Sequence, residues 1–588
     1  MNHLHFVRRH SALLALAAVL FAMVAAPYLV PIDPDSAVFR SGTFGALLLM
    51  ACFLPVRDAL ARTDARTLLC AMLMGLLFSL SLSLGSELRV YQGLLPGMGS
   101  MMRRLAVPLL ITPLLGSLIA RAMRMRPSCG RHAVPACAYL LILLLSWLPA
   151  LLSYFPAAIN YDFTGQANQI VYQAYNHTQP MLHTLFAQLM LRIGELLGSR
   201  TLGLLLMTLV QMLLFASSLA YACVFAQRRG APAWMLALMT LYFALHPIFS
   251  IMSISTTKDT LFASAILVLT LQSLEILEEG AAFFTRRRRV CLFVAVAACA
   301  AMLRSNGLAV LLLTFPALFI ACRGFRKQIV LLAIGCALTA GLASAAIDWA
   351  FQPADALARR WVIVPAQQLV RAYHSDALPQ EQKDEIRSWY VADAGLRIHP
   401  YLADGAKAYL DNDRLTRNGR DFFSLWIRTG LQCPREYIEA FLLLNIGSWY
   451  TDDLTHSTIY WDASWNDKGY LQTNEYDLSD IGLNVCCYLP AVRELYEKIC
   501  RRNEYQKYPV ISLLFNTAIP FWGIVAAGFL LCARRRSRML AALLCPIGLW
   551  GTYLFFGPCT LPRYILPLFC LAPVLLSVAY LPAPGEAG

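Results

Sequence analysis

The feature that most constrains this chain is a run of apolar residues that recurs along it. The stretch YLLILLLSWLPALLSYF, residues 139–155, is one example. A helix of about 20 apolar residues is long enough to cross the ~30 Å of hydrocarbon in a bilayer. A soluble protein of 588 residues needs a charged surface, whereas only 14% of these residues are charged and 58% are hydrophobic. The sequence therefore predicts an all-α polytopic membrane protein.

The net charge of +14 needs an explanation, because a strongly basic protein can bind nucleic acid. Here the basic residues stand in short loops between apolar runs, as in RRRR at 286–289 and RRRSR at 534–538. The cytoplasmic loops of membrane proteins carry such an excess of lysine and arginine. We therefore expect membrane lipids as partners and no nucleic acid.

The same basic loops predict how the chain threads the membrane. All of them fall on the cytoplasmic side if about fourteen helices cross the bilayer. The basic segments are the N-terminus with Arg8 and Arg9, and residues 57–66, 121–131, 227–230, 286–289, 323–327 and 534–538. The predicted spans lie near residues 11–31, 43–56, 67–85, 105–120, 133–155, 201–226, 233–253, 260–278, 290–304, 307–322, 328–348, 508–532, 539–556 and 564–581.

All the basic loops fall on the cytoplasmic side only if one apolar segment does not cross the membrane: PMLHTLFAQLMLRIGELLG at 180–198. Its leucines fall on one helical face, and a polar stripe falls on another: Thr184, Gln188, Arg192 and Glu195. A helix of this kind, opened by a proline, suits the membrane surface. We expect it to lie flat on the outer face, and a tilted span buried among other helices is the alternative.

The expected fold resembles a membrane core with one large insertion, a mostly helical extracytoplasmic domain before the last three spans. Two shorter outer loops, 156–200 and 253–259, belong to the core. The predicted regions are 1–132, an N-terminal four-helix membrane region; 133–348, the membrane core; 349–507, the extracytoplasmic domain; and 508–588, a C-terminal three-helix membrane region.

Two acids stand at the outer ends of predicted spans and are candidates for catalysis. Asp259 opens the eighth span, where an acid can also simply cap the helix and complement its dipole. Asp162 is expected in the loop after the fifth span, where an acid opposes the dipole, so capping does not explain it. A solvated loop residue is the alternative for Asp162.

Basic residues on the outer side are outliers, because the positive-inside pattern depletes them there. Arg304 in LRSNG and Arg563 in LPRY each interrupt or border an apolar run, and Lys258 precedes Asp259. Ionisable groups at such depth are usually paired and often mark a functional site, although snorkelling to lipid headgroups is the alternative. Together the three cations would suit a lipid-linked phosphate.

His177 and His183 could bind substrate or, with a nearby acid, a divalent ion. Their separation of six residues matches no compact helical site, so the sequence favours structural hydrogen bonding. A further Asp/Asp/His cluster, YTDDLTH at 450–456, is interpreted as a loop of the outer domain. We predict no fixed metal site and, as cofactor, at most a loosely bound divalent cation. Four cysteines of the long outer segment could pair, in ways that the sequence leaves open: Cys433, Cys486, Cys487 and Cys500.

The order of these elements resembles that of the GT-C glycosyltransferases, in which an acid in the first outer loop precedes a His/Pro element and a second acid. One branch contains protein mannosyltransferases and lipid A aminoarabinose transferases, and has a motif like HPPL after the first acid. HTQPML at 177–182 is a looser version of that motif. LPRYILP at 561–567 is similar to the branch's Arg-Tyr element, which adds Tyr564 as a substrate-binding candidate.

A closer similarity is to a bacterial family of membrane proteins of unknown function, and it covers about residues 140–580. The shared stretches are STTKDTLF at 255–262, LRSNGLAVLLL at 303–313, VPAQQLVR at 364–371 and CPREYIEAFL…GSWY at 433–450. This chain departs from the GT-C pattern in having a single Asp after Lys as its second acid and no Asp-Glu pair after Asp162, so substrate and metal dependence are not carried over.

The resemblance implies an enzyme that moves a sugar, with inversion, from a polyprenyl-phosphate-type donor to an extracytoplasmic glycan, lipid or protein. Asp162 would be the general base, and Lys258, Arg304 and Arg563 would stabilise the leaving phosphate. Asp259 would position Lys258, bind the acceptor or hold a metal. The expected location is a bacterial plasma membrane, with the active site on the extracytoplasmic face. A transporter or flippase of lipid-linked saccharides and a non-catalytic membrane assembly protein are the alternatives.

Overall fold

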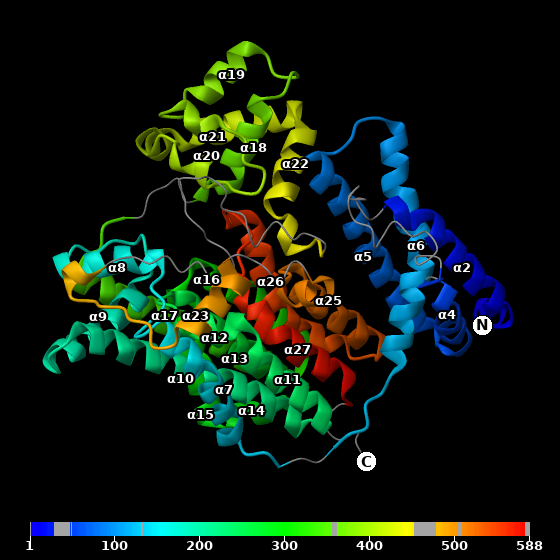
Figure 1. Cartoon of the computed structure of the whole chain (residues 1–588), viewed down its shortest axis with the longest axis horizontal. Coiled ribbons are helices and arrows are strands. Elements are labelled where there is room, and N and C mark those ends of the chain that lie inside the picture. The colour runs from blue at the N-terminus through cyan, green and yellow to red at the C-terminus, as the bar shows by residue number, and fades with distance from the viewer. Residues whose placement is uncertain are drawn as a thin grey trace.

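A computed structural model describes residues 2–28, 47, 48, 50–130, 133–355, 361–451, 478–501 and 508–582. The regular secondary structure of these residues is helical, and their only extended pairing consists of isolated β-bridges. Figure 1 shows a body of packed helices with a smaller group of helices above it and another beside it. The prediction of an all-α protein is confirmed for the described residues.

Seven helices of the described residues are long and apolar enough to cross a membrane. An eighth is added if α11 (Ala233–Leu245) and α12 (Pro247–Ile254), bent by 50° at His246, form one broken span. Four shorter apolar helices are α2 (Ser11–Ala25), α16 (Ser305–Ala321), α25 (Ala518–Ala533) and α27 (Leu566–Tyr580). The seven are α5 (Ala65–Tyr91), α6 (Met98–Arg124), α7 (Ala136–Ser153), α10 (Arg200–Arg228), α13 (Lys258–Glu279), α17 (Arg326–Phe351, counted from Arg323) and α26 (Leu540–Phe556, counted from Ser537).

The chain is therefore a multi-pass membrane protein by the length and composition of its helices, while the number of fourteen spans stays a prediction. The segment that was expected to lie flat, α9 (Met181–Leu196), is not among these apolar helices. It packs against the first turns of α10 through two glycines, because a Cβ on Gly194 would lie only 2.3 Å from the backbone nitrogen of Gly203. Its angle to the membrane stays a prediction.

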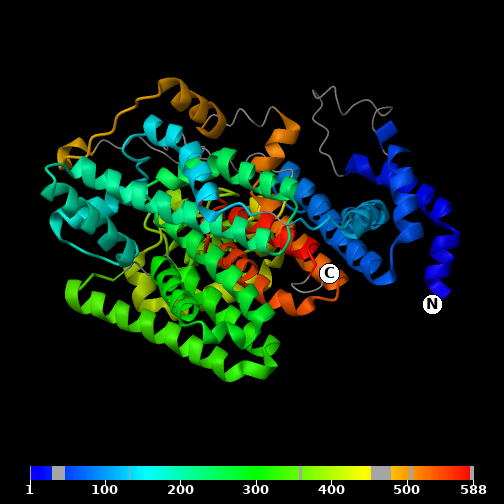
Figure 2. The ribbon, with the colours of Figure 1, turned by 90° about the horizontal axis from the view of Figure 1, so that it is seen from below.

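The N-terminal helices form a group beside the body, blue in Figures 1 and 2. Besides α2, α5 and α6 it contains α1 (Asn2–Arg9) and α4 (Phe53–Arg62). The predicted span 43–56 falls partly outside the described residues. An edge-to-face contact of Phe78 in α5 with Trp522 in α25, 5.0 Å between ring centroids, joins this group to the body.

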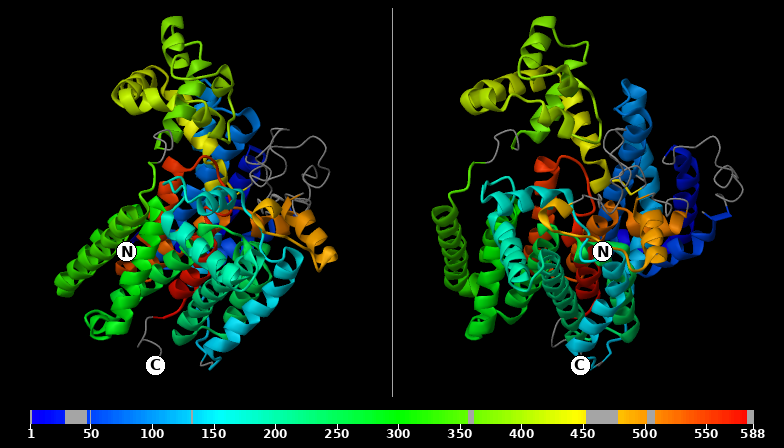
Figure 3. Two further views of the ribbon diagram at one scale, coloured as in Figure 1. Left: turned by 90° about the vertical axis from the view of Figure 1, so that its left-hand side faces the viewer. Right: turned by 60° about the vertical axis from the view of Figure 1, so that its left-hand side comes forward.

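The helical domain between the membrane segments, here called the inserted domain, is described over residues 361–451 and projects from the body (Figure 3). Large apolar side chains, Trp389 and Phe422 among them, fill a core of its own. Its helices are α18 (Ile363–Tyr373), α19 (Gln380–Arg387), α20 (Asp404–Ala408), α21 (Asn412–Gln432) and α22 (Pro434–Leu444). The short helices α23 (Pro490–Tyr496) and α24 (Pro509–Phe515) lead back into the body.

Hydrogen bonds to the rest of the protein hold the inserted domain in place. Glu439 of α22 pairs with Arg371 at 2.6 Å and accepts a hydrogen bond from the backbone nitrogen of Leu94, in the turn between α5 and α6. The backbone nitrogen of Ala403 donates to the carbonyl oxygen of Pro558 at 2.8 Å. The inserted domain is thus fixed to both the N-terminal group and the turn between α26 and α27.

The basic loops meet at the end of the body away from the inserted domain. Three ion pairs connect them: Arg121 Nη1–Asp58 Oδ2 at 3.6 Å, Arg289 Nη1–Glu279 Oε1 at 2.6 Å and Arg536 Nη2–Glu278 Oε1 at 3.8 Å. Three hydrogen bonds to carbonyl oxygens also connect them, from Arg534 Nη2 to Met125 at 3.0 Å, from the Gly130 nitrogen to Gly230 at 3.1 Å and from Arg538 Nε to Ala321 at 3.0 Å. Positive charge gathered at one end of a helical membrane protein is typical of its cytoplasmic side.

Three glycines allow a direct test of this arrangement, because a Cβ added at each meets nothing within 4 Å. Gly165→Cys and Gly419→Cys should react with a membrane-impermeant maleimide in intact cells, since they lie at the end that carries the inserted domain. Gly324→Cys, among the basic loops, should react only after permeabilisation. The measurement is labelling above that of the parent chain. Labelling of Gly165→Cys that required permeabilisation would contradict the predicted orientation.

Candidate functional site

Five charged side chains from distant parts of the sequence meet at one place, here called the ion-pair cluster: Asp162, Lys258, Asp259, Arg304 and Arg563. All five are candidates from the sequence. The loops and helix ends that carry them lie at the end of the body that faces the inserted domain.

Asp162 lies at the beginning of α8 (Tyr161–Tyr172), not in a loop after a helix as expected from the sequence. The expectation was wrong because a separate short helix begins there, with Asn160 as its cap. The side chain of Asn160 accepts a hydrogen bond from the backbone nitrogen of Asp162 at 3.1 Å. An acid in the first turn of a helix complements its dipole, so part of the reason for Asp162 is structural.

Two cations nevertheless hold the carboxylate of Asp162. Lys258 Nζ lies 2.7 Å and Arg563 Nη1 3.1 Å from Asp162 Oδ2. Gln179 bridges Asp162 and Lys258, because its Nε2 donates to Asp162 Oδ1 at 3.2 Å and its Oε1 accepts from Lys258 Nζ at 2.7 Å. Burial alone would raise the pKa of Asp162, but the charges of Lys258 and Arg563 outweigh it and hold this pKa well below its usual range.

Asp259 pairs with the second arginine of the cluster. It lies in the first turn of α13, accepts a hydrogen bond from Thr257 Oγ1 at 3.1 Å, and is bonded to Arg304 Nη1. Arg563 Nη1 is 3.8 Å from its other oxygen, so Arg563 joins both acids.

Arg304 reaches the cluster because it is the single extended residue between α15 (Arg287–Leu303) and α16. The chain turns back there so tightly that a Cβ on Gly307 would lie 2.1 Å from the carbonyl oxygen of Ala300. Glycine is therefore required at position 307 for the two helices to approach.

Tyrosines surround the arginines. Arg563 Nη2 donates to the hydroxyls of Tyr161 at 3.0 Å and Tyr564 at 3.2 Å. Tyr564 stacks on Tyr553 with 5.9 Å between ring centroids, and the guanidinium of Arg304 lies over both rings. Tyr564 is thus a member of the site, as the Arg-Tyr element suggested, whereas sequence reasoning missed the other polar neighbours. Asn160 and Tyr161 could have been found from the sequence because they precede Asp162 directly. Gln179 could have been found because it lies next to Pro180. No sequence signal marks Tyr553, which lies within an apolar run.

The ion-pair cluster carries one more positive than negative charge, because three cations face two acids. Asp162, Asp259 and Arg563 are only 8%, 1% and 4% exposed. Arg563 Nε is buried with no hydrogen-bond partner among the described residues. Buried charge of this kind is normally compensated, so the cluster is suited to an anionic group.

The two candidate histidines lie in different places. His177 lies outside the cluster, with its Nε2 3.5 Å from Asp348 at the surface. His183 in α9 is fully buried, and its Nδ1 is 3.0 Å from Gln166 Oε1, while its Nε2 has no partner among the described residues. Burial, and then the positive charge of Lys258, lower the pKa of His183 to about 3. His183 is therefore a neutral imidazole close to the cluster.

The other sequence candidates add no further site. The described residues contain no group of three or more histidine, cysteine or acidic side chains that could hold a metal ion. Of YTDDLTH, residues 452–456 lie outside the described residues. Cys433, Cys486 and Cys487 are not in disulfide bonds, and the side chain of Cys500 is not described.

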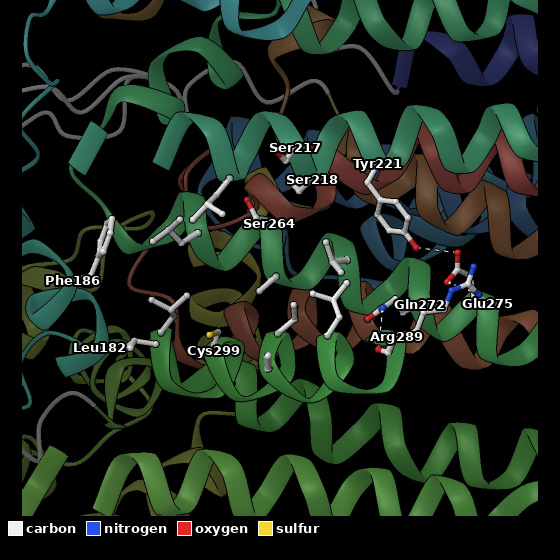
Figure 4. A pocket seen from close by; sticks show the side chains of 18 of the residues that line it. Leu182, Phe186, Ser217, Ser218, Tyr221, Ser264, Gln272, Glu275, Arg289 and Cys299 are labelled. Atoms are coloured by element: carbon white, nitrogen blue, oxygen red, sulfur yellow. Dashed lines mark hydrogen bonds and ion pairs between the residues drawn. The ribbon is translucent and has the colours of Figure 1, made fainter. Parts of the chain in front are cut away.

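An apolar cavity of about 670 Å³, here called the trench, lies between α9, α10, α13 and α15 and begins close to the cluster, although none of the five charged residues lines it. Leu182, Phe186 and His183 of α9 lie at the end near the cluster, with Leu261 and Leu303, which lie close in sequence to Asp259 and Arg304. Figure 4 shows apolar side chains along its middle and a polar group, with Tyr221 and Glu275, at the far end.

The neutral state of His183 predicts a loss of stability in acid. Below pH 6.5 the unfolded chain protonates this imidazole, while the folded protein does not until about pH 3. The unfolded state then binds more protons than the folded state. Each unit by which the pH falls therefore lowers the free energy of unfolding by up to about 1.4 kcal/mol. His183→Asn, which can still donate to Gln166, should lose less melting temperature between pH 6.5 and pH 4.5 than the wild type. The same substitution at His177, whose side chain is 39% exposed, is the control. An equally steep loss in His183→Asn would contradict the assignment.

Comparison with known proteins gives a family but no activity. Residues 175–581, more than half of the chain, match a family of unknown function, DUF6020. The match includes Lys258, Asp259, Arg304 and Arg563, and it begins after Asp162. No curated protein and no solved structure matches the chain. The chain belongs to the DUF6020 family of unknown function.

Proposed function

We propose that this protein is an integral membrane glycosyltransferase that moves a sugar from a polyprenyl-phosphate-type donor to an extracytoplasmic acceptor, with inversion. The observation that carries the proposal is a buried, positively charged cluster that lies beside the end of an apolar trench. A lipid-linked sugar phosphate has both parts, an anionic group and a long hydrocarbon tail. A soluble sugar nucleotide would leave the trench without a ligand.

The cations supply what a phosphate leaving group requires. Its negative charge grows as the bond from the anomeric carbon to the phosphate oxygen breaks, and fixed cations stabilise that charge. Arg563 can offer two N–H groups of its planar fork to phosphate oxygens, and Lys258 a compact charge beside them. Arg304, held by Asp259, adds a third positive charge.

The pairing of Asp162 suggests how donor binding activates the base. In the free protein Lys258 and Arg563 lie on Asp162 and reduce its affinity for a proton. A donor phosphate competes with this carboxylate for the same two cations. As the phosphate binds, Asp162 loses part of its positive surroundings and becomes more basic. It then accepts the proton of the acceptor hydroxyl while that oxygen forms its bond to the anomeric carbon.

The location of the site is part of the proposal. The basic loops lie at the opposite end of the body, which supports an extracytoplasmic face for the cluster if that end is cytoplasmic. A GT-C-like fold with about fourteen spans in a bacterial plasma membrane is consistent with helices at nearly all predicted spans. The inserted domain, whose Asp404 is close enough for its charge to act on Tyr161, would lie over the site on the acceptor side.

A transporter or flippase of lipid-linked saccharides is the second candidate, because the trench extends a long way from the cluster. Its lining is mostly apolar, however, and a sugar headgroup would need polar partners along such a path. A non-catalytic assembly protein is the third, and it would be indifferent to changes in Asp162.

The Asp162→Asn variant tests the base directly. The amide preserves shape but accepts no proton, so sugar transfer should fall about 100- to 10,000-fold. Donor affinity should stay equal or increase, because the phosphate no longer competes with a carboxylate for Lys258 and Arg563. The measurements are sugar transfer and donor-lipid binding in nanodiscs.

Two controls separate chemistry from folding. Asp348→Asn makes the same change at an acid that is half exposed and should leave transfer unchanged. Donor binding by Asp162→Asn shows that the variant is folded. Transfer at the wild-type rate would exclude Asp162 as the base and leave Asp259 as the candidate. If neither acid were needed, the mechanism would be wrong.

Arg563→Lys tests the phosphate contact. Lysine keeps the charge but loses the fork that reaches Asp162, Tyr161 and Tyr564 together. Donor affinity and turnover should each fall by about 10- to 100-fold, the range for hydrogen bonds to charged groups. Arg397→Lys, an exposed arginine of the inserted domain, is the matched control. Unchanged donor affinity in Arg563→Lys would remove Arg563 from the donor site.

A further inference from the structure

The trench ends in a set of hydrogen-bonded polar side chains, here called the polar floor: Tyr221, Gln272, Glu275 and Arg289. The hydroxyl of Tyr221 donates to Glu275 Oε1 at 3.0 Å. Arg289 Nη1 lies 3.6 Å from Glu275 Oε2 and 2.6 Å from Glu279 Oε1. Gln272 Nε2 donates to the carbonyl oxygen of Arg289 at 3.5 Å. These contacts join α10, α13 and α15 across the end of the trench.

Hydrocarbon cannot pass the floor without a cost. Glu275 is 6% exposed and its charge is compensated by Tyr221 and Arg289, so separating these groups would leave a buried charge without partners. Gln272 Oε1 is already buried with no partner among the described residues. An apolar chain pushed against it would remove any remaining access to water.

The distance from the cluster to the floor is set by a single helix. On α13 the lining residues are Leu261, Ser264, Ala265, Val268, Gln272 and Glu275, which share one face because they are three or four positions apart. Leu261 and Gln272 are eleven residues apart, which is about 16 Å along a helix. An extended hydrocarbon chain with C–C bonds of about 1.5 Å advances about 5 Å per isoprene repeat of four chain carbons. The trench therefore holds about three isoprene units above the floor, by the helical rise.

The side chains along the trench favour a branched tail. Small residues line it on two helices, Ser217 and Ser218 on α10 and Ser264 and Ala265 on α13. They leave width for the methyl branch of each isoprene unit, which a straight acyl chain would leave unfilled. An unfilled apolar space loses the contacts of its lining, so the branched chain is favoured.

We propose that the polar floor limits the trench to the first few isoprene units of the donor tail and thereby defines which part of the lipid is recognised. This inference rests on the proposed function, because it takes the phosphate to lie in the ion-pair cluster. The rest of a longer tail leaves the trench sideways into the bilayer and contributes little to affinity.

Binding of prenyl monophosphates of rising length to the purified full chain in nanodiscs tests the proposal. Affinity, expressed per ligand dissolved in the nanodisc, should rise severalfold for each unit up to farnesyl phosphate, because each unit fills more of the trench than lipid does, and then change little. Dodecyl phosphate, a straight chain that ends near the length of farnesyl phosphate, should bind more weakly. Equal binding would overturn the assignment of an isoprenoid tail.

Two variants should move the plateau in opposite directions. Gln272→Leu extends the apolar lining and should move the plateau to geranylgeranyl phosphate. Val268→Phe fills the trench above the floor and should weaken farnesyl phosphate while leaving geranyl phosphate nearly unchanged. The control is Gln328→Leu, the same glutamine-to-leucine substitution on α17, outside the trench. It should behave as the wild type. Geranyl phosphate binding confirms that each variant is folded.

The two levels of proposal fail differently. If no prenyl phosphate binds to the wild type or to any variant, the proposed function fails and this inference fails with it. If prenyl phosphates bind but affinity rises without a plateau, or neither variant moves the plateau, only the role of the polar floor is overturned.

Discussion

The pairing of buried charges in the ion-pair cluster is the constraint on which the rest of the site depends. A buried cation or carboxylate without a partner is very unfavourable, so Asp162, Asp259, Lys258, Arg304 and Arg563 can exist at this depth only together. Their pairing joins α8, α13, the α15–α16 turn and the loop before α27. Helices from distant parts of the chain must therefore converge at this end of the body.

Sequence alone identified the members of this cluster because each is an exception to a strong physical rule. Basic residues are depleted from one side of a membrane protein, and acids are rare beside apolar runs, so Lys258, Arg304, Arg563, Asp162 and Asp259 stood out. Helices were equally predictable, since apolar runs of sufficient length have few other stable structures in a bilayer. Which residues pair with which was not predictable, because the pairs join positions up to 401 residues apart.

The errors of the sequence reading have local causes. Asp162 was placed after a helix because α8, a short helix with few apolar residues, is hidden in a polar stretch. His177 was considered together with His183 as a residue that binds substrate or a metal ion, but the backbone of His177 pairs with Ala354 beyond α17, which turns it away from the cluster. Gln179, between the two histidines, is the residue that actually contacts Asp162 and Lys258. Amides give no periodic or charge signal, so the contacts of Gln179 with Asp162 and Lys258 appear only in three dimensions.

Helix ends add to the electrostatics of the cluster. Both α8 and α13 begin there, and the positive ends of their dipoles favour an anion at the same place as the three cations. Asp162 and Asp259, each in a first turn, occupy these positions in the free protein, and in the proposed mechanism the donor phosphate competes there with Asp162. Because α13 also carries Leu261, Gln272 and Glu275, one rigid helix connects the anion site to the polar floor. In the proposed complex, a headgroup bound at the beginning of α13 would fix how far down the trench its tail can reach, so α13 would couple the selection of headgroup and tail.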